Sequence, residues 1–350
     1  MIAISLKVLG YFIVFLSAVP LIRKDYWTFR VVEYPRLQKL LLTVAILVLS
    51  LVFIRTDDIW DYVFLGALLI NTGYLCYLVY PFTPLAPKTM LNAAVADDRH
   101  GLSLLVSNVY QYNRRVDDCL RLYRRIDPDL ILLLETDSWW TEHLSELESD
   151  YPYRVLHPRD NTYGIALYSR LPLSEEKVRF LVEDDIPSVS AIVTLRSGQQ
   201  VQFFGLHPTP PVPQENPRST ERDKEILLIG REAKKCRLPV IVAGDLNDVA
   251  WSYTTDLFLK TSGLLDPRMG RGFFNTFDAR YPLFRYPLDH VFTSNDFTVA
   301  DLKRLPNCGS DHFPMYIRVQ YNPQAKKVQE EPEAAPEEKE LAEEKIKKPV

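Results

Sequence analysis

The segment PVIVAGDLN, residues 239–247, decides the fold. It begins with an apolar run of strand length and ends in Asp245 and Asn247. Continuous apolar runs of this kind are typical of strands buried on both faces. A carboxylate in such a strand is costly to bury unless another group pairs with it. The segment therefore predicts a buried strand that carries two polar side chains to its carboxyl end.

The same pattern recurs along the chain on both sides of this segment. Polar residues follow or precede apolar strands at Asn108 after LSLLVS, Glu135 after LILLL, His207 after VQFFGL, Asp289 at the start of DHVFTS, and Asp311 and His312 before MYIRVQY. Several strands ending this way at one rim would form an acidic cluster, which a hard divalent cation such as Mg²⁺ requires. The pattern predicts a metal-assisted active site at that rim.

The order of the elements predicts the architecture. Helical spacing of apolar residues is found over 117–126 and about 219–235, and these segments fall between groups of strands. Strands outnumber helices. This order favours an α/β sandwich with two central sheets and helices outside.

The motifs also resemble a known family. SNVYQYN, LLLETD, YGIALYSR, GLHPTP, AGDLND, LDHVF and SDHFP occur between residues 107 and 314. Their order and approximate spacing are similar to those of the endonuclease/exonuclease/phosphatase superfamily. The resemblance covers about residues 100–321 and implies a four-layer α/β/β/α sandwich of the deoxyribonuclease I type.

The resemblance implies a role for each matching residue. Glu135 would be the main metal-binding carboxylate, helped by Asn108 and Asp311. Asp245 and Asn247 would position the attacking water and the phosphate. His312, oriented by Asp289, would be a general base or an electrostatic partner of the phosphate, and His207 would contact a phosphate oxygen and assist the leaving group. The implied cofactor is Mg²⁺, with Mn²⁺ as a substitute.

Three residues near the motifs have an alternative interpretation. Alternation along the strand sends His290 to the face opposite Asp289, so we expect a structural role for it. Trp139 and Trp140 follow Glu135 closely. They could stack on substrate, but packing in the core is the favoured interpretation.

The first 82 residues contain three apolar stretches, at 8–22, 40–54 and 62–80. With their flanking residues these stretches reach the ~20 residues that a membrane helix needs. The first stretch lacks the basic start and small-residue cleavage site of a signal peptide. We therefore expect residues 1–82 to be a membrane anchor of three transmembrane helices, followed by a linker over 83–94.

The loops between these stretches predict the orientation. The loop at 23–39 carries Arg23, Lys24, Arg30, Arg36 and Lys39, whereas the loop RTDDIWD is net acidic. By the positive-inside rule the basic loop is cytoplasmic. This places the catalytic domain in the cytoplasm, at what we expect to be the inner membrane of a bacterium.

Charge and cysteine content limit the partners of the domain over 95–321. Its 27 Lys and Arg are outnumbered by 32 Asp and Glu, so a basic surface that grips nucleic acid is not indicated. The scattered cysteines argue against a disulfide framework or a zinc site. The tail over 322–350 is highly charged and is expected to be disordered apart from a short helix within EEKELAEEKIKK, and to be dispensable for activity.

The expected function is Mg²⁺-dependent hydrolysis of a phosphodiester or phosphomonoester at a membrane. A small or lipid-linked substrate is favoured over duplex DNA, because the domain is slightly acidic and the anchor confines it to the bilayer. Two alternatives remain open at this point. One is a nuclease acting on DNA or RNA, and the other is a scaffold that has lost catalysis and uses the fold for binding.

Overall fold

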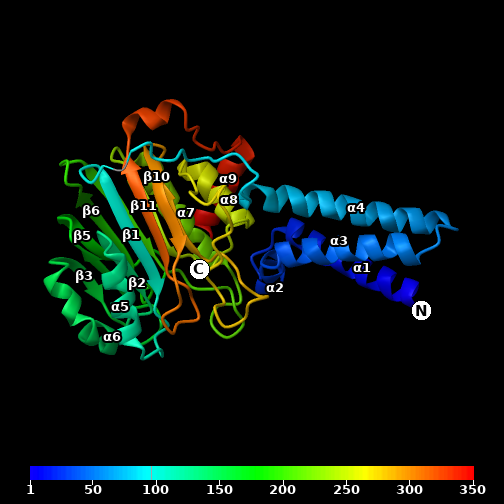
Figure 1. Cartoon of the computed structure of the whole chain (residues 1–350), viewed down its shortest axis with the longest axis horizontal. Helices are drawn as coiled ribbons and strands as arrows, with labels where there is room; N and C mark the ends of the chain where they lie inside the picture. Colours follow the sequence, from blue (N-terminus) through cyan, green and yellow to red (C-terminus); the bar gives the residue numbers. More distant parts are fainter. Residues whose placement is uncertain (96) are drawn as a thin grey trace.

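The computed structural model describes residues 1–95 and 97–350. Its N-terminal part is a bundle of three helices, α1 (Ile2–Ala18), α3 (Arg36–Phe53) and α4 (Ile59–Val79), which projects away from the rest of the molecule (Figure 1). Three segments, Ile2–Ile22, Arg36–Phe53 and Ile59–Phe82, are long and apolar enough to cross a membrane. The three apolar helices expected from the sequence are therefore present.

The connection between α1 and α3 lies against the domain that follows the bundle. It contains a 3₁₀ turn at Val19–Ile22, the short helix α2 (Trp27–Arg30) and a second 3₁₀ turn at Val31–Glu33. The backbone amide of Trp27 donates to the carbonyl of Pro217, and that of Ser219 donates to the carbonyl of Asp25. We call residues 19–35 the docking loop, because hydrogen bonds join it to the catalytic domain.

Two sheets form the centre of the catalytic domain. The six-stranded sheet has the order β10-β11-β1-β2-β4-β3, and the five-stranded sheet has the order β5-β6-β7-β8-β9. The strands of the first sheet are β1 (Gly101–Asn108), β2 (Leu130–Leu134), β3 (Tyr153–His157), β4 (Ile165–Ser169), β10 (Phe297–Arg304) and β11 (Met315–Tyr321). Those of the second are β5 (Leu173–Arg179), β6 (Ser188–Thr194), β7 (Gln200–Leu206), β8 (Val240–Asp245) and β9 (Asp289–Thr293).

Helices cover the outer face of each sheet, which gives four layers. The six-stranded sheet packs against α5 (Val116–Ile126) and α6 (Ser138–His143) through buried residues such as Tyr123 and Trp140. The five-stranded sheet packs against α7 (Thr220–Lys235) and α8 (Tyr253–Ser262). A third apolar core lies between the two sheets. The two-sheet α/β architecture expected from the sequence is confirmed.

Three strands have no counterpart among the apolar runs that define the other strands in the sequence. They are β3, β5 and β10, and each is an edge strand of its sheet. Each is partly exposed to solvent, as in the LSEEKVR segment of β5. Edge strands with mixed polar and apolar residues lack the continuous apolar run that marks a strand buried on both faces.

The linker between the anchor and the domain is bound along its length. Met90 is fully buried in the core between the sheets. The amide of Ala93 donates to the carbonyl of Val299, and the amide of Val299 donates to the carbonyl of Leu91. The linker therefore extends the edge of the six-stranded sheet beside β10.

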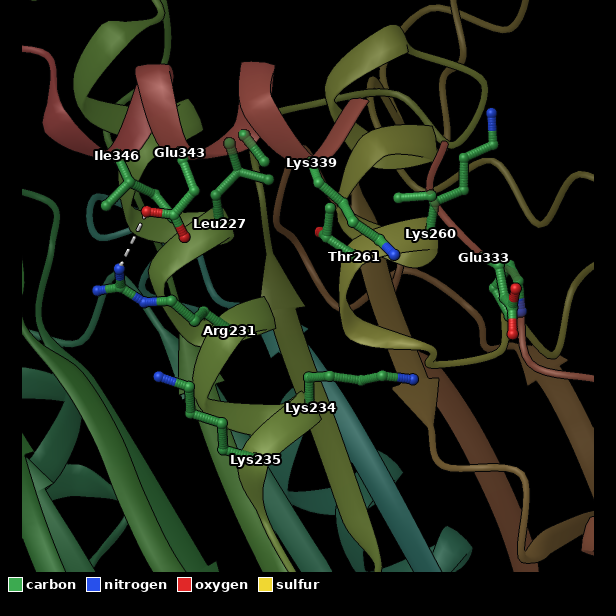
Figure 2. Close-up of a pocket in the computed structure, with 13 residues that line it drawn as sticks. Leu227, Arg231, Lys234, Lys235, Lys260, Thr261, Glu333, Lys339, Glu343 and Ile346 are labelled. Carbon is green, nitrogen blue, oxygen red and sulfur yellow. Dashed lines mark ion pairs between the residues drawn. The ribbon is translucent and has the colours of Figure 1, made fainter. Parts of the chain in front are cut away.

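The C-terminal tail differs from the expectation of disorder. Helix α9 (Pro336–Lys347) packs on α7 and α8, with Ala342 and Ile346 in the core outside the five-stranded sheet. Figure 2 shows the pocket beneath it, where Ile346 and Leu227 form part of the apolar lining and Arg231 pairs with Glu343. Helix α9 covers the segment in which a short helix is expected. It is packed on the domain and not solvated, because its few apolar residues lie on the side that faces the domain.

Candidate active site

The polar residues at the strand ends are brought to one rim by the pairing of the strands. In the five-stranded sheet β7 and β8 are parallel, so His207 and Asp245 leave the sheet at the same edge. Strand β9 runs antiparallel to β8, and Asp245 is the register partner of Asp289. In the other sheet β1 and β2 are parallel, and Asn108 pairs with Leu134, the residue before Glu135.

A buried cluster of Asp245, Asp289 and His312 lies at the centre of this rim, with ligand atoms all within 4.8 Å of one another. The Nδ1 atom of His312 lies 2.8 Å from the Oδ2 atom of Asp289. The Nε2 atom of the same ring lies 3.5 Å from the Oδ2 atom of Asp245. His207 approaches from the other side, with its Nε2 atom 3.9 Å from that oxygen. Two imidazole rings therefore flank one carboxylate.

Asn108 connects the two sheets across this rim. Its Nδ2 atom donates to the Oε1 atom of Glu135 at 2.8 Å and to the Oδ2 atom of Asp245 at 3.2 Å. The other carboxylate oxygen of Glu135 accepts from the backbone amide of Gln111 at 3.1 Å. A single neutral amide is therefore shared by the buried Asp245 and the half-buried Glu135.

Glu135 and Asn247 both have left-handed backbones, with φ values of 62° and 50°. Residues other than glycine rarely adopt this conformation, and when they do it is often at a functional site. The side chain of Asn247 donates to the carbonyl of Pro208 at 2.9 Å, and its backbone amide donates to Asp245 at 3.0 Å. These bonds fix the loop that follows β8.

Asp311 lies at the border of the site. Its Oδ2 atom is 3.4 Å from the guanidinium of Arg280, and its carbonyl accepts from the amide of Ala279. Its charge contributes to the raised pKa of Glu135. The structure thus brings all eight residues expected at the site to the same rim, three of them in the central cluster and Asp311 at the border.

Burial sets the protonation of the key groups. It raises the pKa of Glu135 to about 7, although hydrogen bonds from Asn108 and Gln111 oppose the shift. Burial lowers the pKa of His207 to about 4, so this ring is neutral at pH 7. Burial would also lower the pKa of His312, but Asp289 and Asp245 outweigh it and raise that pKa to about 10. His312 is therefore an imidazolium at neutral pH.

The donor set fits a hard divalent cation. Within residues 1–95 and 97–350, no Lys or Arg side chain forms an ion pair with Glu135, Asp245 or Asp289. In the same part of the chain, the buried Oδ1 atom of Asp289 has no hydrogen-bond partner. Carboxylate oxygens that gather at a site where no Lys or Arg side chain pairs with them are the ligands that Mg²⁺ prefers.

His290, Trp139 and Trp140 lie near the motifs but outside the cluster of Asp245, Asp289 and His312. His290 is bound on both ring nitrogens, to Arg268 at 2.6 Å and to the carbonyl of Asp248 at 2.8 Å, which agrees with a structural role. Trp140 is fully buried in the core, and Trp139 stacks on His143 with ring centroids 4.0 Å apart. Both tryptophans therefore serve packing.

The structure adds residues to which the sequence assigns no role at the site. Phe277 lies beside His312 with ring centroids 4.9 Å apart, and Tyr163 lies beside His207 at 5.2 Å. The carbonyl of Asn247 accepts from Arg222 at 2.7 Å and from Tyr34 at 2.9 Å. Tyr163 lies within a quoted motif, but nothing in the sequence near Arg222 or Tyr34 indicates their contact with this loop.

Comparison with known proteins agrees with this geometry. Residues 105–312 match the profile of the Endonuclease/Exonuclease/phosphatase family. No curated protein sequence matches the chain.

Solved structures with a similar fold cover the catalytic domain. A humanized TDP2 from D. rerio is 19% identical with a TM-score of 0.52, over 63% of this chain and 99% of that one. The human Nocturnin catalytic domain with bound sulfate is 15% identical with a TM-score of 0.52, over 65% and 97%. An endonuclease/exonuclease/phosphatase protein from Beutenbergia cavernae is 16% identical with a TM-score of 0.51, over 64% and 72%. At these identities the similarity shows the fold.

Proposed function

Since this chain belongs to the Endonuclease/Exonuclease/phosphatase family, whose members are metal-dependent hydrolases, we propose that it is a membrane-anchored, Mg²⁺-dependent phosphoesterase. The observation that carries the proposal is the hydrogen bonding of Asn108 to both Glu135 and Asp245. It joins an acid from each sheet into one buried site. A binding scaffold would have no need for two acids brought together where no Lys or Arg side chain of the described residues pairs with them.

The charge of each residue at neutral pH determines the role that we assign to it. In-line attack on a phosphoester develops negative charge on the phosphoryl oxygens, and the imidazolium of His312 is placed to stabilise it. Because a ring that is already protonated cannot accept a proton, we assign the activation of water to Asp245, with Asn247 beside it. His207 is neutral and can donate a hydrogen bond from one ring nitrogen to a phosphate or leaving-group oxygen. Asp289 holds the ring of His312 in place.

The metal would add Lewis-acid stabilisation of the phosphoryl group. Glu135, with Asn108 and Asp311, would hold Mg²⁺, and Mn²⁺ prefers similar oxygen ligands.

The choice between lipid-linked and nucleic-acid substrates rests on the arginines near the first motif. Arg114 pairs with Asp137, Arg124 pairs with Glu146, and Arg115 and Arg121 both pair with Asp118. Internal pairing reduces the positive charge available to neutralise the phosphates of a nucleic acid. A TDP2 from D. rerio has been solved with a single-strand DNA product, so a nuclease is the second candidate. The pairing supports a small or lipid-linked phosphoester instead.

The proposed location is the inner membrane of a bacterium, with the domain in the cytoplasm. The docking loop contacts the domain, so both lie on the same side of the bundle. The basic residues of 23–39 favour the cytoplasmic side during insertion. A reporter fused after Val350 should therefore be active in its cytoplasmic form, and activity only in the periplasmic form would overturn this orientation.

The function is tested with the full chain reconstituted in phospholipid nanodiscs. We expect Mg²⁺-dependent hydrolysis of bis-p-nitrophenyl phosphate and of a lipid phosphodiester, with little nicking of plasmid DNA at ~150 mM salt, where weak electrostatic binding is screened. EDTA should abolish the activity. The metal-assisted mechanism is wrong if turnover persists in EDTA, and the second candidate is correct if only the plasmid is cleaved.

A further inference from the structure

An exposed apolar turn lies between α8 and β9. The amide of Phe284 donates to the carbonyl of Tyr281 at 3.0 Å, and Pro282 occupies the second position of this turn, where its fixed φ is favourable. The side chains at its tip are largely exposed, with fractions of 59% for Tyr281, 77% for Leu283 and 59% for Phe284. Adjacent large apolar side chains exposed in this way indicate a contact surface.

The turn is held against the end of the three-helix bundle that is nearest to the domain. The Nε2 atom of Gln38 donates to the carbonyl of Leu283 at 2.9 Å, and Gln38 lies in the first turn of α3, within a candidate membrane span. The ring of Tyr286 packs edge-on against Tyr34 with centroids 5.4 Å apart. In Figure 1 the yellow-to-orange loop accordingly reaches the anchor beside α2. The tip therefore lies beside the first turn of α3.

The base of the same loop forms part of the rim of the candidate active site. Ala279 donates its amide to the carbonyl of Asp311 at 2.7 Å, and Arg280 pairs with both Asp278 and Asp311. Phe277, just before the loop, packs against His312. Nine residues, 278–286, thus connect the candidate active site with the N-terminal end of α3.

We propose that the 278–286 loop inserts its tip into the bilayer and thereby presents the active site to phosphoesters of membrane lipids. This inference rests on the proposed function and names its substrate class. A bilayer is the occupant because the backbone of Leu283 is bonded to a membrane-spanning helix. The tip is also flanked by Arg280 and Arg285, and basic residues beside an aromatic and aliphatic tip suit the headgroup region.

Insertion is tested directly with a fluorescent probe. The full chain carrying Cys76→Ala and Cys236→Ser is labelled at Leu283→Cys with an environment-sensitive dye and reconstituted in phosphatidylcholine–phosphatidylglycerol vesicles containing spin-labelled lipids. We expect strong quenching at position 283. The matched control is Val328→Cys, because Val328 is 67% exposed and lies beyond β11. Equal, weak quenching at both positions would overturn the proposal, as would protection of position 283 by a second copy or another protein.

A second measurement separates this inference from the proposed function. The double variant Leu283→Ser/Phe284→Ser is compared with wild type on bis-p-nitrophenyl phosphate and on a vesicle phospholipid. We expect the ratio of lipid turnover to soluble turnover to fall at least tenfold, while Val328→Ser keeps the wild-type ratio. An unchanged ratio would refute the role of the loop alone. Absence of turnover on both substrates in the wild type would refute the proposed function.

Discussion

The hydroxyl of Tyr34 donates a hydrogen bond of 2.9 Å to the main-chain carbonyl of Asn247. Tyr34 lies in the docking loop between α1 and α3, and Asn247 lies in the loop after β8. Arg222 donates to the same carbonyl at 2.7 Å. The docking loop therefore helps to hold a residue of the candidate active site in its left-handed conformation.

Replacing Tyr34 with Phe should lower kcat without a matching change in KM. The variant keeps the ring that packs on Tyr286 but loses one of the two donors to Asn247. Loss of a hydrogen bond worth about 1 kcal/mol corresponds to a decrease in kcat of roughly fivefold. Hydrolysis of bis-p-nitrophenyl phosphate by the full chain measures both constants. The control is Tyr62→Phe, whose exposed side chain is in the anchor; equal kcat in the two variants would contradict a positioning role for Tyr34.

Asp245→Asn should reduce turnover by about two orders of magnitude or more and leave the fold intact. The substitution keeps the size of the side chain but removes the charge that the two histidines flank, and with it the capacity to activate water. Turnover and circular dichroism are measured together. Asp184→Asn, at an exposed position, is the matched control. Wild-type turnover in Asp245→Asn would refute the assignment of water activation.

Mg²⁺ affinity should depend on pH through Glu135. Metal binding requires the ionised carboxylate, and burial raises its pKa to about 7. A proton therefore competes with the metal below pH 7, and the apparent affinity should fall by up to about tenfold per pH unit there. Titration calorimetry from pH 5 to 8 measures this slope. Glu135→Gln should bind weakly with no such slope, whereas the exposed control Glu142→Gln should keep it.

Lys345→Met should destabilise the protein although it lies near the C-terminus. Lys345 is buried and pairs with Asp25 of the docking loop at 2.8 Å and with Asp223 of α7 at 2.9 Å. Burial opposes ionisation of Asp223, but Lys345, Arg222 and Arg30 hold its pKa well below its usual value. Arg222 and Arg30 still pair with Asp223, and Lys348 still pairs with Asp25, so we expect a cost below the ~3 kcal/mol of a buried charge left without any partner. Thermal unfolding should show a lower midpoint for Lys345→Met than for the exposed control Lys347→Met.

The strand-end residues of the site could be predicted from the sequence because each stands next to the strand that positions it. Asp245 directly ends its apolar run, and the parallel pairing of neighbouring strands brings such ends together. The support behind these residues could not be predicted in this way. Tyr34 and Asn247 are 213 positions apart, and Lys345 and Asp25 are 320 positions apart.

The error over the tail has the same physical origin. A charged segment is expected to be solvated, since burying an unpaired charge is costly. That expectation fails for Lys345, because two carboxylates from distant segments compensate its charge. The composition of the tail shows that it is charged, but it does not show which distant residues will pair with those charges.

The buried linker has a consequence for how the enzyme meets its substrate. A flexible linker of about twelve residues would let the domain explore a radius of about 20 Å. Here Met90 is fixed in the core, and the neighbouring backbone is bonded to Val299. If the three-helix bundle spans a bilayer as we propose, the active site stays at one height above that bilayer and in one orientation. Encounters with a lipid substrate would then occur by lateral diffusion, and the search for it would be two-dimensional.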